Sequence, residues 1–473
     1  MSITVVVGLL SGQTAALRVG FDDSVDAVAL RAQTALRVAT GRLRAAAGRH
    51  LSTCELVKDC GVQDGDMLTL HISRVQIQAS HATFAAILGD GSVVTWGAQF
   101  GGDTRGVQDQ LQNVQQIQAS SGAFAAILGD ASVVTWGEDQ SGGDSIDVQD
   151  QLKNVQQIQA NCGAFAAILD DGSVATWGAT FYGGDSSAVQ DQLQNVRQIQ
   201  AADYAFAAIL VDGCVVTWGA CSWGGDSSAV QDQLKNVQQI QASDKAFAAI
   251  VADGSVVTWG HPDHGGDSST VQAQLRSVQQ IQATQDAIAA VLADGSVVTW
   301  GGAERVRAYS AAHGNLQNVQ QIQTTDHAFA AILGDGCVVT WGLPRYGGDA
   351  SAVKDQLRNV QQIQATGTAF AAILGNGSVV TWGDSRGGDS TAVQRQLNNV
   401  QQIQASGGAF AAILADGSVA TWGHAHYGGD SCAVQDQLKN VQQIHATHKA
   451  FAAILADGSV VTWGHPDYGP LTG

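Results

Sequence analysis

Aspartate is the residue type in this sequence whose spacing most resembles a chemical site. Eight aspartates follow a Gly-Gly pair at regular intervals, and carboxylates gathered into a ring could hold a cation or a basic peptide. Asp beside Gly also caps turns by accepting backbone N–H groups. No calcium-loop spacing accompanies these residues, so turn capping is the favoured interpretation. The eight are Asp103, Asp144, Asp185, Asp226, Asp267, Asp349, Asp389 and Asp430.

The histidines and cysteines form no catalytic or metal-binding pattern. His261 lies near His264 and His424 lies near His426, but cysteine partners at zinc-ligand spacing are absent. The seven cysteines show no C-x-x-C spacing, and none has a recognisable base beside it in the sequence. We therefore predict no catalytic residue, no metal site and no cofactor, in a protein that is not an enzyme.

Composition disfavours two classes of partner. The 473 residues carry a formal net charge of −19, which opposes binding to nucleic acid or to an anionic membrane surface. No apolar run is long enough to span a bilayer, and the start MSITVVVGLLSG lacks the basic segment of a secretion signal. Cysteines without a disulfide framework favour a reducing compartment. We predict a cytoplasmic or nuclear protein.

An internal repeat accounts for most of the chain, so its strands and loops must carry any functional site. Thr-Trp-Gly recurs ten times at intervals of 40 or 41 residues and fills the chain from about Val75 to Gly464. Each unit contains segments such as VQQIQA, AFAAIL and SVVTWG, which are short and rich in Val, Ile and Phe and so predict strands. A polar return such as SSAVQDQLKN follows, as a fourth edge strand or an irregular strap.

Asp-Gly joins the second and third segments in most copies. This pair between two apolar runs predicts a hairpin with a type I′ turn, in which both central residues have positive φ. Asn376-Gly377 is an equivalent pair. Asp130-Ala131 is the departure, where Ala is expected to be strained.

One unit cannot bury both faces of its small sheet, so neighbouring units must pack side by side. Units of about 41 residues with three or four strands predict β-propeller blades, in which Ala allows close approach and Phe fills the space between blades. Ten copies leave three arrangements open: a large ring, a ring with extra blades, or an open spiral. The sixth copy lacks Gly-Gly-Asp from Gly301 to Asn315 and is interpreted as an irregular seam.

The pattern V-x-x-I-x-A followed by A-x-x-D-G-x-V-x-x-W-G resembles the repeat of the regulator-of-chromosome-condensation (RCC1-like) family. It recurs ten times over residues 75–464. Two departures are a shorter unit and Gly-Gly-Asp where that family usually has Gly-Gln-Leu-Gly. The resemblance implies a propeller that binds proteins.

Residues 1–73 contain no Thr-Trp-Gly and form a separate unit. Strands are expected at 3–10 and 14–19, a helix at about 24–38 with Ser24 as its N-cap, and further strands at 42–46 and 67–72. The stretches LLSGQTAALRV, GRLRAAAGRHL and VQDGDMLTLHI resemble ubiquitin-like domains.

The resemblance to ubiquitin stops at two functional features. Ubiquitin's apolar recognition patch maps to Leu10, Arg44 and His71, of which only Leu10 is apolar. Ile72 runs directly into the first repeat instead of a free Gly-Gly end, so conjugation is not expected. The predicted fold class is therefore mainly β: a β-propeller of RCC1-like repeats (74–465) after a small α+β ubiquitin-like, or β-grasp, domain (1–73), with a C-terminal tail (466–473).

Two places vary among the ten copies, one just before AFAAIL and one just after Thr-Trp-Gly. The ends of the first and third strands of an antiparallel meander lie on the same edge, so both places should share one face of the propeller. Large aromatic side chains on loops of a rigid scaffold are typical of partner recognition, although drift at unconstrained positions explains variation equally simply. The predicted partner-binding residues are Phe100, Tyr182, Trp223, Tyr346 and Tyr427.

These observations favour a non-catalytic interaction scaffold or adaptor that binds a protein partner, with no nucleic acid and no membrane. The resemblances imply a link to the ubiquitin pathway, as a relative or fragment of the HECT-type ubiquitin ligases that carry RCC1-like repeats. Nucleotide exchange on a small GTPase and inhibition of another protein's active site are the alternatives.

Overall fold

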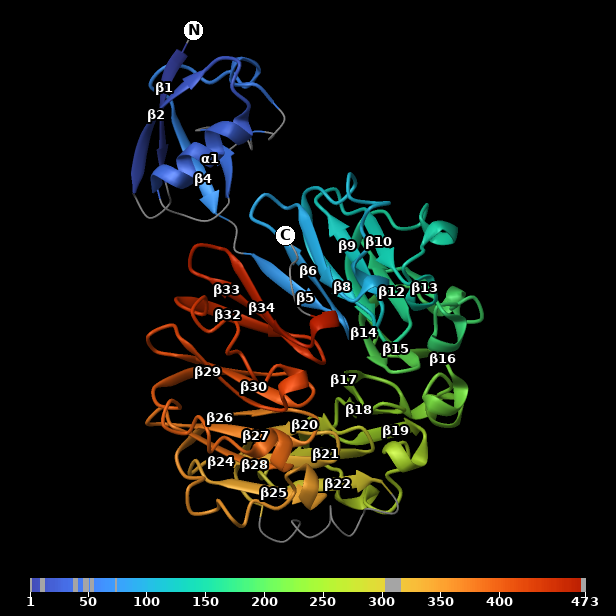
Figure 1. Ribbon diagram of the computed structural model, residues 1–473. Helices are drawn as coiled ribbons and strands as arrows, with labels where there is room; N and C mark the ends of the chain where they lie inside the picture. The colour runs from blue at the N-terminus through green and yellow to red at the C-terminus, as the bar shows by residue number, and fades with distance from the viewer. Residues whose placement is uncertain are drawn as a thin grey trace.

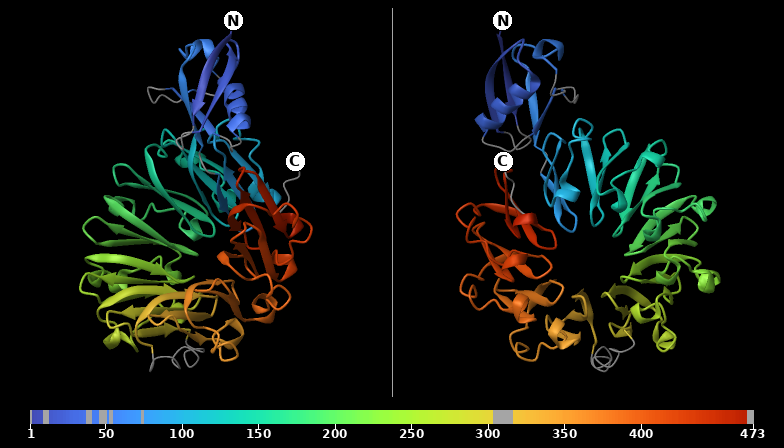
Figure 2. Two further views of the ribbon diagram at one scale, coloured as in Figure 1. Left: turned by 90° about the vertical axis from the view of Figure 1, so that its left-hand side faces the viewer. Right: turned by 45° about the vertical axis from the view of Figure 1, so that its right-hand side comes forward.

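The computed structural model describes residues 2–8, 13–36, 41–45, 51, 55–72, 75–302 and 316–468. The chain is mainly β, with an N-terminal unit followed by ten three-stranded sheets arranged around a central opening (Figures 1 and 2). No helix among the described residues has both the length and the apolar character needed to cross a bilayer.

The N-terminal unit has the element order that the sequence predicts. Its sheet runs β2-β1-β4-β3, with β1 and β4 parallel and the other pairs antiparallel. Ser24 caps the helix by accepting the Ala27 N–H at 3.2 Å. The elements are β1 (Ser2–Gly8), β2 (Thr14–Gly20), α1 (Val25–Leu36), β3 (Gly41–Arg44), the 3₁₀ turn η1 (Val57–Asp59) and β4 (Met67–Ile72).

Two of the predicted patch positions can be placed in this sheet. Arg44 ends β3 opposite Thr69, and His71 lies on β4 opposite Arg42. Leu10 lies outside the described residues.

Each of the ten repeats forms one antiparallel sheet, which we call a blade. Blades 1 to 5 are β5 (Gln76–Ala79), β6 (Thr83–Ile87), β7 (Val93–Gly97); β8 (Val114–Ala119), β9 (Ala123–Leu128), β10 (Val133–Gly137); β11 (Val155–Ala160), β12 (Ala164–Leu169), β13 (Val174–Gly178); β14 (Val196–Ala202), β15 (Ala205–Leu210), β16 (Val215–Gly219); and β17 (Val237–Ala242), β18 (Ala246–Val251), β19 (Val256–Gly260). Blades 6 to 10 are β20 (Val278–Ala283), β21 (Ala287–Leu292), β22 (Val297–Gly301); β23 (Val319–Thr324), β24 (Ala328–Leu333), β25 (Val338–Gly342); β26 (Val360–Ala365), β27 (Ala369–Leu374), β28 (Val379–Gly383); β29 (Val400–Ala405), β30 (Ala409–Leu414), β31 (Val419–Gly423); and β32 (Val441–Ala446), β33 (Ala450–Leu455), β34 (Val460–Gly464).

Short helical turns follow the third strands and interrupt the returns. Those after the third strands are α2 (Gln99–Gly102), η2 (Asp139–Ser141), η4 (Thr180–Tyr182), η6 (Cys221–Trp223), η8 (Pro262–His264), η10 (Pro344–Tyr346), α4 (Ser385–Gly388), η11 (Ala425–Tyr427) and η12 (Pro466–Tyr468). Those in the returns are η3 (Ile146–Val148), η5 (Gln190–Gln192), η7 (Ser228–Gln233) and η9 (Gln272–Gln274).

The Asp-Gly hairpins are present, but the predicted type I′ turn is wrong. In blade 3 the Gly172 N–H donates to the Leu169 carbonyl at 3.0 Å, so the turn begins one residue earlier than expected. Gly172 has φ +78°, whereas Asp171 does not have positive φ. This is a type I turn followed by a left-handed glycine. Ala131 takes φ +63° at the same place, the strained conformation that the sequence predicts.

Nine blades pack a Phe–Trp pair against the alanines of the blade before them, and blade 6 packs Ile288 and Trp300 in the same way. Between blades 3 and 4, Phe206 stacks on Trp218 with ring centres 5.3 Å apart. Both rings lie against Ala164 and Ala166 in one core cluster. Small residues on one side and large ones on the other give a close-packed interface, as the sequence predicts.

The polar return is an irregular strap, not a fourth strand. We call the segment from Gly-Gly to the residue before the next first strand the strap. In the strap between blades 3 and 4, Leu193 is fully buried in the interface and Gln190 donates from Nε2 to the Val174 carbonyl at 2.8 Å. Asn195 ends this strap with φ +56°, and the Val196 N–H donates to the Gly172 carbonyl of the preceding turn at 2.8 Å.

The ten blades close into one ring. Val75, Ile77 and Phe84 of blade 1 share a core cluster with Ala450 and Ile454 of blade 10. This settles the arrangement that the sequence leaves open. The sixth copy forms an ordinary blade in contact with both neighbours, while the predicted seam at 303–315 lies outside the described residues.

Candidate protein-binding face

The two variable loops of a blade lie side by side on one edge of the ring. We call the loop between the first and second strands the first loop, the loop between Trp-Gly and Gly-Gly the trailing loop, and the edge that carries both the loop edge. In blade 3 the Asn161 side-chain amide donates to the Tyr182 carbonyl at 2.7 Å, and in blade 5 the Ser243 hydroxyl donates to the His264 carbonyl at the same distance. One polar side chain at the end of the first strand therefore anchors the trailing loop.

Backbone hydrogen bonds join the first loops of neighbouring blades. The Asp203 N–H donates to the Asp244 carbonyl at 3.0 Å, and the Asp326 N–H donates to the Gly367 carbonyl at 3.0 Å. The His448 N–H closes the series with the His81 carbonyl at 3.2 Å. Because only the main chain takes part, side chains at these positions can differ from blade to blade without loss of the bond.

Blades 3 to 5 bring aromatic side chains into one contiguous cluster. Tyr182 stacks on Tyr204 at 5.1 Å between ring centres, and Tyr204 meets the Trp223 ring edge-on at 4.1 Å. Phe181, whose side chain is 56% exposed, contacts all three rings. The Lys245 ammonium lies 4.9 Å from the Trp223 ring centre, a cation–π contact with the next blade.

The structure therefore unites only two of the five predicted residues, Tyr182 and Trp223. Tyr346 packs instead on His327 of its own blade, and Tyr427 lies between His424 and His448. Phe100 lies in α2, and its side chain is not described. Their role in binding stays a prediction.

Phe181, Tyr204 and Lys245 were not selected from the sequence. Each lies in a variable stretch, but no pattern along the chain shows that first loops face the trailing loop of the preceding blade. That adjacency follows only from the packed ring.

A second cluster on the loop edge spans the closing interface. His81 of blade 1 stacks on His448 of blade 10 at 4.7 Å between ring centres, and Tyr427 and Tyr468 flank this pair. The Lys449 ammonium lies near both tyrosine rings. Burial, together with the nearby positive charge of Lys449, lowers the pKa of both histidines.

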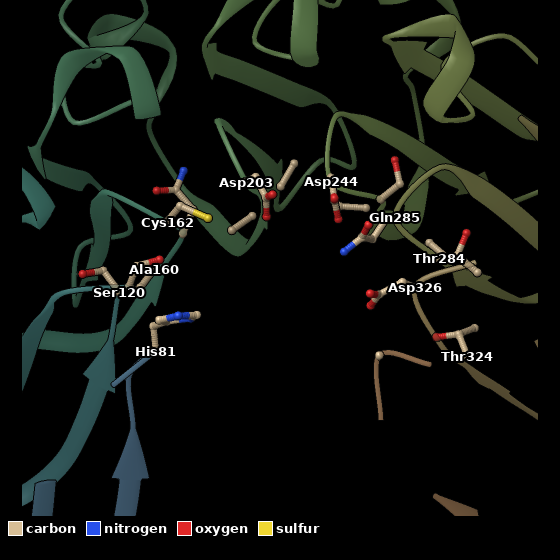
Figure 3. Close-up of a pocket in the computed structure, with 18 of the residues that line it drawn as sticks. His81, Ser120, Ala160, Cys162, Asp203, Asp244, Thr284, Gln285, Thr324 and Asp326 are labelled. Atoms are coloured by element: carbon tan, nitrogen blue, oxygen red, sulfur yellow. The ribbon is translucent and has the colours of Figure 1, made fainter. Parts of the chain in front are cut away.

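The first loops surround a cavity of about 750 Å³ at the centre of the loop edge. Asp203, Asp244 and Asp326 follow one another along its wall, with His81 across from Asp326 (Figure 3). Burial raises the pKa of all three carboxyl groups, and for Asp244 burial together with the Asp203 and Asp326 charges raises it to about 7. Three carboxyl groups that are costly to ionise therefore line this cavity.

The aspartates of Gly-Gly-Asp are turn caps, as the favoured interpretation holds. Asp185 accepts the Ser187 N–H at 2.9 Å, and its pKa is lowered by this backbone bond and by the Ser187 hydroxyl. The preceding Gly183 has φ +90°, and a Cβ there would lie 2.9 Å from the Phe206 ring of the next blade. The packing of blades therefore requires the first glycine, and the turn uses the aspartate.

Cys162 lines the cavity but has the opposite of a nucleophile's electrostatics. Burial, with the nearby Asp203 charge, raises the pKa of its thiol to about 11, whereas a reactive cysteine needs a lowered one. His261 and His264 contact each other edge-on. In the described part of the chain, no three His, Cys, Asp or Glu side chains lie close enough together to hold a metal ion.

Comparison with known proteins adds little to this geometry. No family model and no curated protein matches the chain. Among solved structures, a designed protein named Ika8 covers 74% of this chain and 96% of its own at 13% identity and a TM-score of 0.31. Prp20p from Saccharomyces cerevisiae covers 57% and 83% at 14% identity and a TM-score of 0.33. Caldiarchaeum subterraneum ubiquitin covers 15% of this chain and 91% of its own at 26% identity and a TM-score of 0.14. At such TM-scores the assignment as a β-propeller rests on the strand pairing and ring closure described above.

Proposed function

We propose that the protein is a non-catalytic interaction scaffold that binds a protein partner on the loop edge. The observation that carries this proposal is the cluster of Phe181, Tyr182, Tyr204 and Trp223, which spans neighbouring blades and keeps an exposed ring at its top. Aromatic side chains at such positions dominate binding energy in protein interfaces. Tyr204 lies on a backbone-bonded first loop, and the Asn161 side-chain amide holds the Tyr182 carbonyl, so little conformational entropy is lost on binding.

The cavity beside this cluster supports a partner of a particular charge. Asp203 and Asp244 line the cavity from the first loops of blades 4 and 5, and the next residues of the same loops are Tyr204 and Lys245. A partner that places Lys or Arg in the cavity would favour the ionised carboxylates there. We propose an aromatic contact at the rim with a basic side chain at the centre.

The binding proposal is tested by removing the cluster. The variant Phe181→Ala/Tyr182→Ala/Trp223→Ala should bind the purified partner at least about tenfold more weakly, because each ring is a candidate anchor residue. Ile146→Ala is the matched control, since Ile146 is an exposed apolar residue on a strap. Circular dichroism melting checks that both variants stay folded. Equal affinity for the triple variant and the control would reject the loop edge as the binding face.

A link to the ubiquitin pathway is the finer part of this proposal. The sheet order β2-β1-β4-β3 with α1 after the first hairpin supports it, together with the sequence resemblance of residues 1–73. Binding of purified ubiquitin-conjugating enzymes to the chain, measured with and without residues 1–73, is the direct test. Stimulated release of labelled GDP from a small GTPase would instead favour the exchange-factor alternative.

A further inference from the structure

The aromatic cluster of blades 3 to 5 presents rings that cross one another at steep angles. Phe181, its exposed member, crosses the Tyr182 ring at 89° and the Trp223 ring at 77°. Tyr204 meets Trp223 at 63°, and the three rings other than Phe181 are half-buried. An approaching segment therefore meets both faces and edges of aromatic rings instead of one flat apolar surface.

The same cluster carries hydrogen-bond donors that the protein itself does not use. In the described part of the chain, the Tyr182 and Tyr204 hydroxyls and the Trp223 indole N–H make no hydrogen bond. Burial, with the nearby Tyr182 and Asp203 groups, raises the pKa of Tyr204, so its hydroxyl keeps its proton. Aromatic rings with such polar tips fit a segment that brings apolar side chains together with free carbonyl oxygens.

Carboxyl groups lie directly beside these rings. Asp203 precedes Tyr204 in its first loop, and the Asp203 N–H donates to the carbonyl of Asp244 in the next blade. Both side chains line the cavity (Figure 3). Neither has an ion-pair partner among the described residues, because the Lys245 ammonium lies over the Trp223 ring instead. A segment that passes from the rings to the cavity therefore meets carboxyl groups that favour Arg or Lys.

We propose that the partner segment on the loop edge is a proline-rich stretch in the polyproline II conformation, with an Arg or Lys beside it. This inference rests on the function proposed above and names the chemistry of its partner. Polyproline II makes no internal backbone hydrogen bonds, so its carbonyls accept from the donors of Tyr182, Tyr204 and Trp223. Its prolines pack on the aromatic rings, as in other peptide-binding domains. The basic side chain reaches Asp203 and Asp244.

A helix or an added strand fits these features less well. The carbonyls of a helix are bonded within the helix, so the free donors of the cluster would gain no acceptor. Strand addition needs an exposed sheet edge, whereas the cluster lies on the loops that follow and precede the strands. A proline-rich segment is also ordered before it binds, so its binding costs little conformational entropy.

The first experiment uses the full chain and the fluorescent peptide Arg-Ala-Pro-Pro-Ala-Pro-Pro-Ala-Pro. Fluorescence anisotropy should show saturable binding. Phe181→Ala should weaken this binding at least about fivefold, because an exposed anchor ring is lost. The matched control Ile146→Ala, which removes an exposed apolar side chain from a strap, should leave the affinity unchanged. The variant Tyr182→Phe/Tyr204→Phe keeps every ring contact and should bind at least about threefold more weakly, because only the two hydroxyl donors are lost.

The second experiment isolates the carboxyl groups. It is made at pH 8, because burial and the neighbouring Asp203 and Asp326 charges raise the pKa of Asp244 to about 7. The peptide should bind at least about fivefold more tightly than the same peptide with Ala in place of Arg. In the variant Asp203→Asn/Asp244→Asn this difference should disappear, while the affinity for the Ala peptide stays unchanged.

Four outcomes would overturn the proposal. They are no binding up to about 1 mM peptide, equal binding of a peptide with Ala in place of every Pro, equal binding by Phe181→Ala, and a preference for Arg that persists in the Asn variant. If the peptide fails while Phe181→Ala/Tyr182→Ala/Trp223→Ala still loses the purified partner, the polyproline assignment is wrong and the scaffold function stands. If that triple variant keeps its affinity for the partner, both proposals fall.

Discussion

Neighbouring blades are joined by different contacts on the two edges of the ring. On the loop edge, the main chain of one first loop bonds to the next, as Asp203 does to Asp244. On the Asp-Gly edge the main chain also bonds, as the Val237 N–H does to the Gly213 carbonyl at 2.9 Å, but this join depends on residue identity: Gly213 has φ +81° and packs against Asn236, which itself has φ +55°. The difference shows why one edge is nearly uniform in sequence and the other varies. Variation on the loop edge costs little stability and is therefore available for recognition.

The largest expected effect comes from Gly213→Ala on the Asp-Gly edge. A Cβ at Gly213 would lie 2.7 Å from the Asn236 Cα, and the left-handed backbone penalises any residue other than glycine. We expect a loss of about 3 kcal/mol in the free energy of unfolding, measured by urea denaturation.

Gly367→Ser on the loop edge is the matched control for that substitution. Ser121 already occupies the equivalent position in blade 2, and the nearest atoms to a new Cβ belong to the mobile end of the Asp326 side chain. A change within about 0.5 kcal/mol is expected. If both glycine substitutions cost the same, the contrast between the edges would be wrong.

Ionisation distinguishes the edges as well. In the Asp-Gly turns, the Ser hydroxyl and N–H two residues on lower the pKa of the aspartate, as Ser173 does for Asp171. In the first loops, burial raises the pKa of Asp203, Asp244 and Asp326. The same residue type is therefore stabilised as an anion on one edge and destabilised on the other.

An effect of intermediate size is expected from Asp244, whose ionisation makes the free energy of unfolding depend on pH. The pKa of Asp244 is raised from 3.8 to about 7 in the folded protein. Between these two pH values the folded state therefore binds more protons than the unfolded state. The contribution of Asp244 to stability is full at low pH and is lost as the pH rises through about 7. Asp244→Asn should therefore gain about 1–2 kcal/mol near pH 8 and little near pH 4, since one pKa unit is worth about 1.4 kcal/mol and partial solvent access reduces the full shift.

Urea denaturation of the wild type and of Asp244→Asn across this pH range measures the effect. The neighbouring Asp203, Asp286 and Asp326 and the Lys245 ammonium remain in place, so part of the slope persists in the variant. A variant with the wild-type slope would show that Asp244 titrates at its ordinary pKa.

The sequence predicted the strands and the blade interface, which depend on residues within each repeat. It did not predict the contacts between loops of different blades, which exist only in the closed ring. The Val, Ile and Phe segments gave the strands, and Ala164 opposite Phe206 gave the interface. The turn type was wrong because Leu169, which looks like a strand residue, also accepts the turn's hydrogen bond. The cluster was only half found, since Tyr182 meets Tyr204 across two blades. The carbonyls that join the first loops carry no side-chain signal at all.

The smallest effect is expected at the one Asp-Gly turn that lacks glycine. Ala131 holds φ +63°, which costs a residue with a Cβ about 1–2 kcal/mol. Glycine removes that strain but loses about 0.5–1 kcal/mol to backbone entropy, so Ala131→Gly should raise the free energy of unfolding by about 0.5–1 kcal/mol. Ala252→Gly, at an exposed turn position without positive φ in blade 5, should lower it by a similar amount. Opposite signs for these two substitutions, measured by urea denaturation, would show that backbone conformation determines the sequence of this edge; a loss for both would mean that Ala131 is not strained.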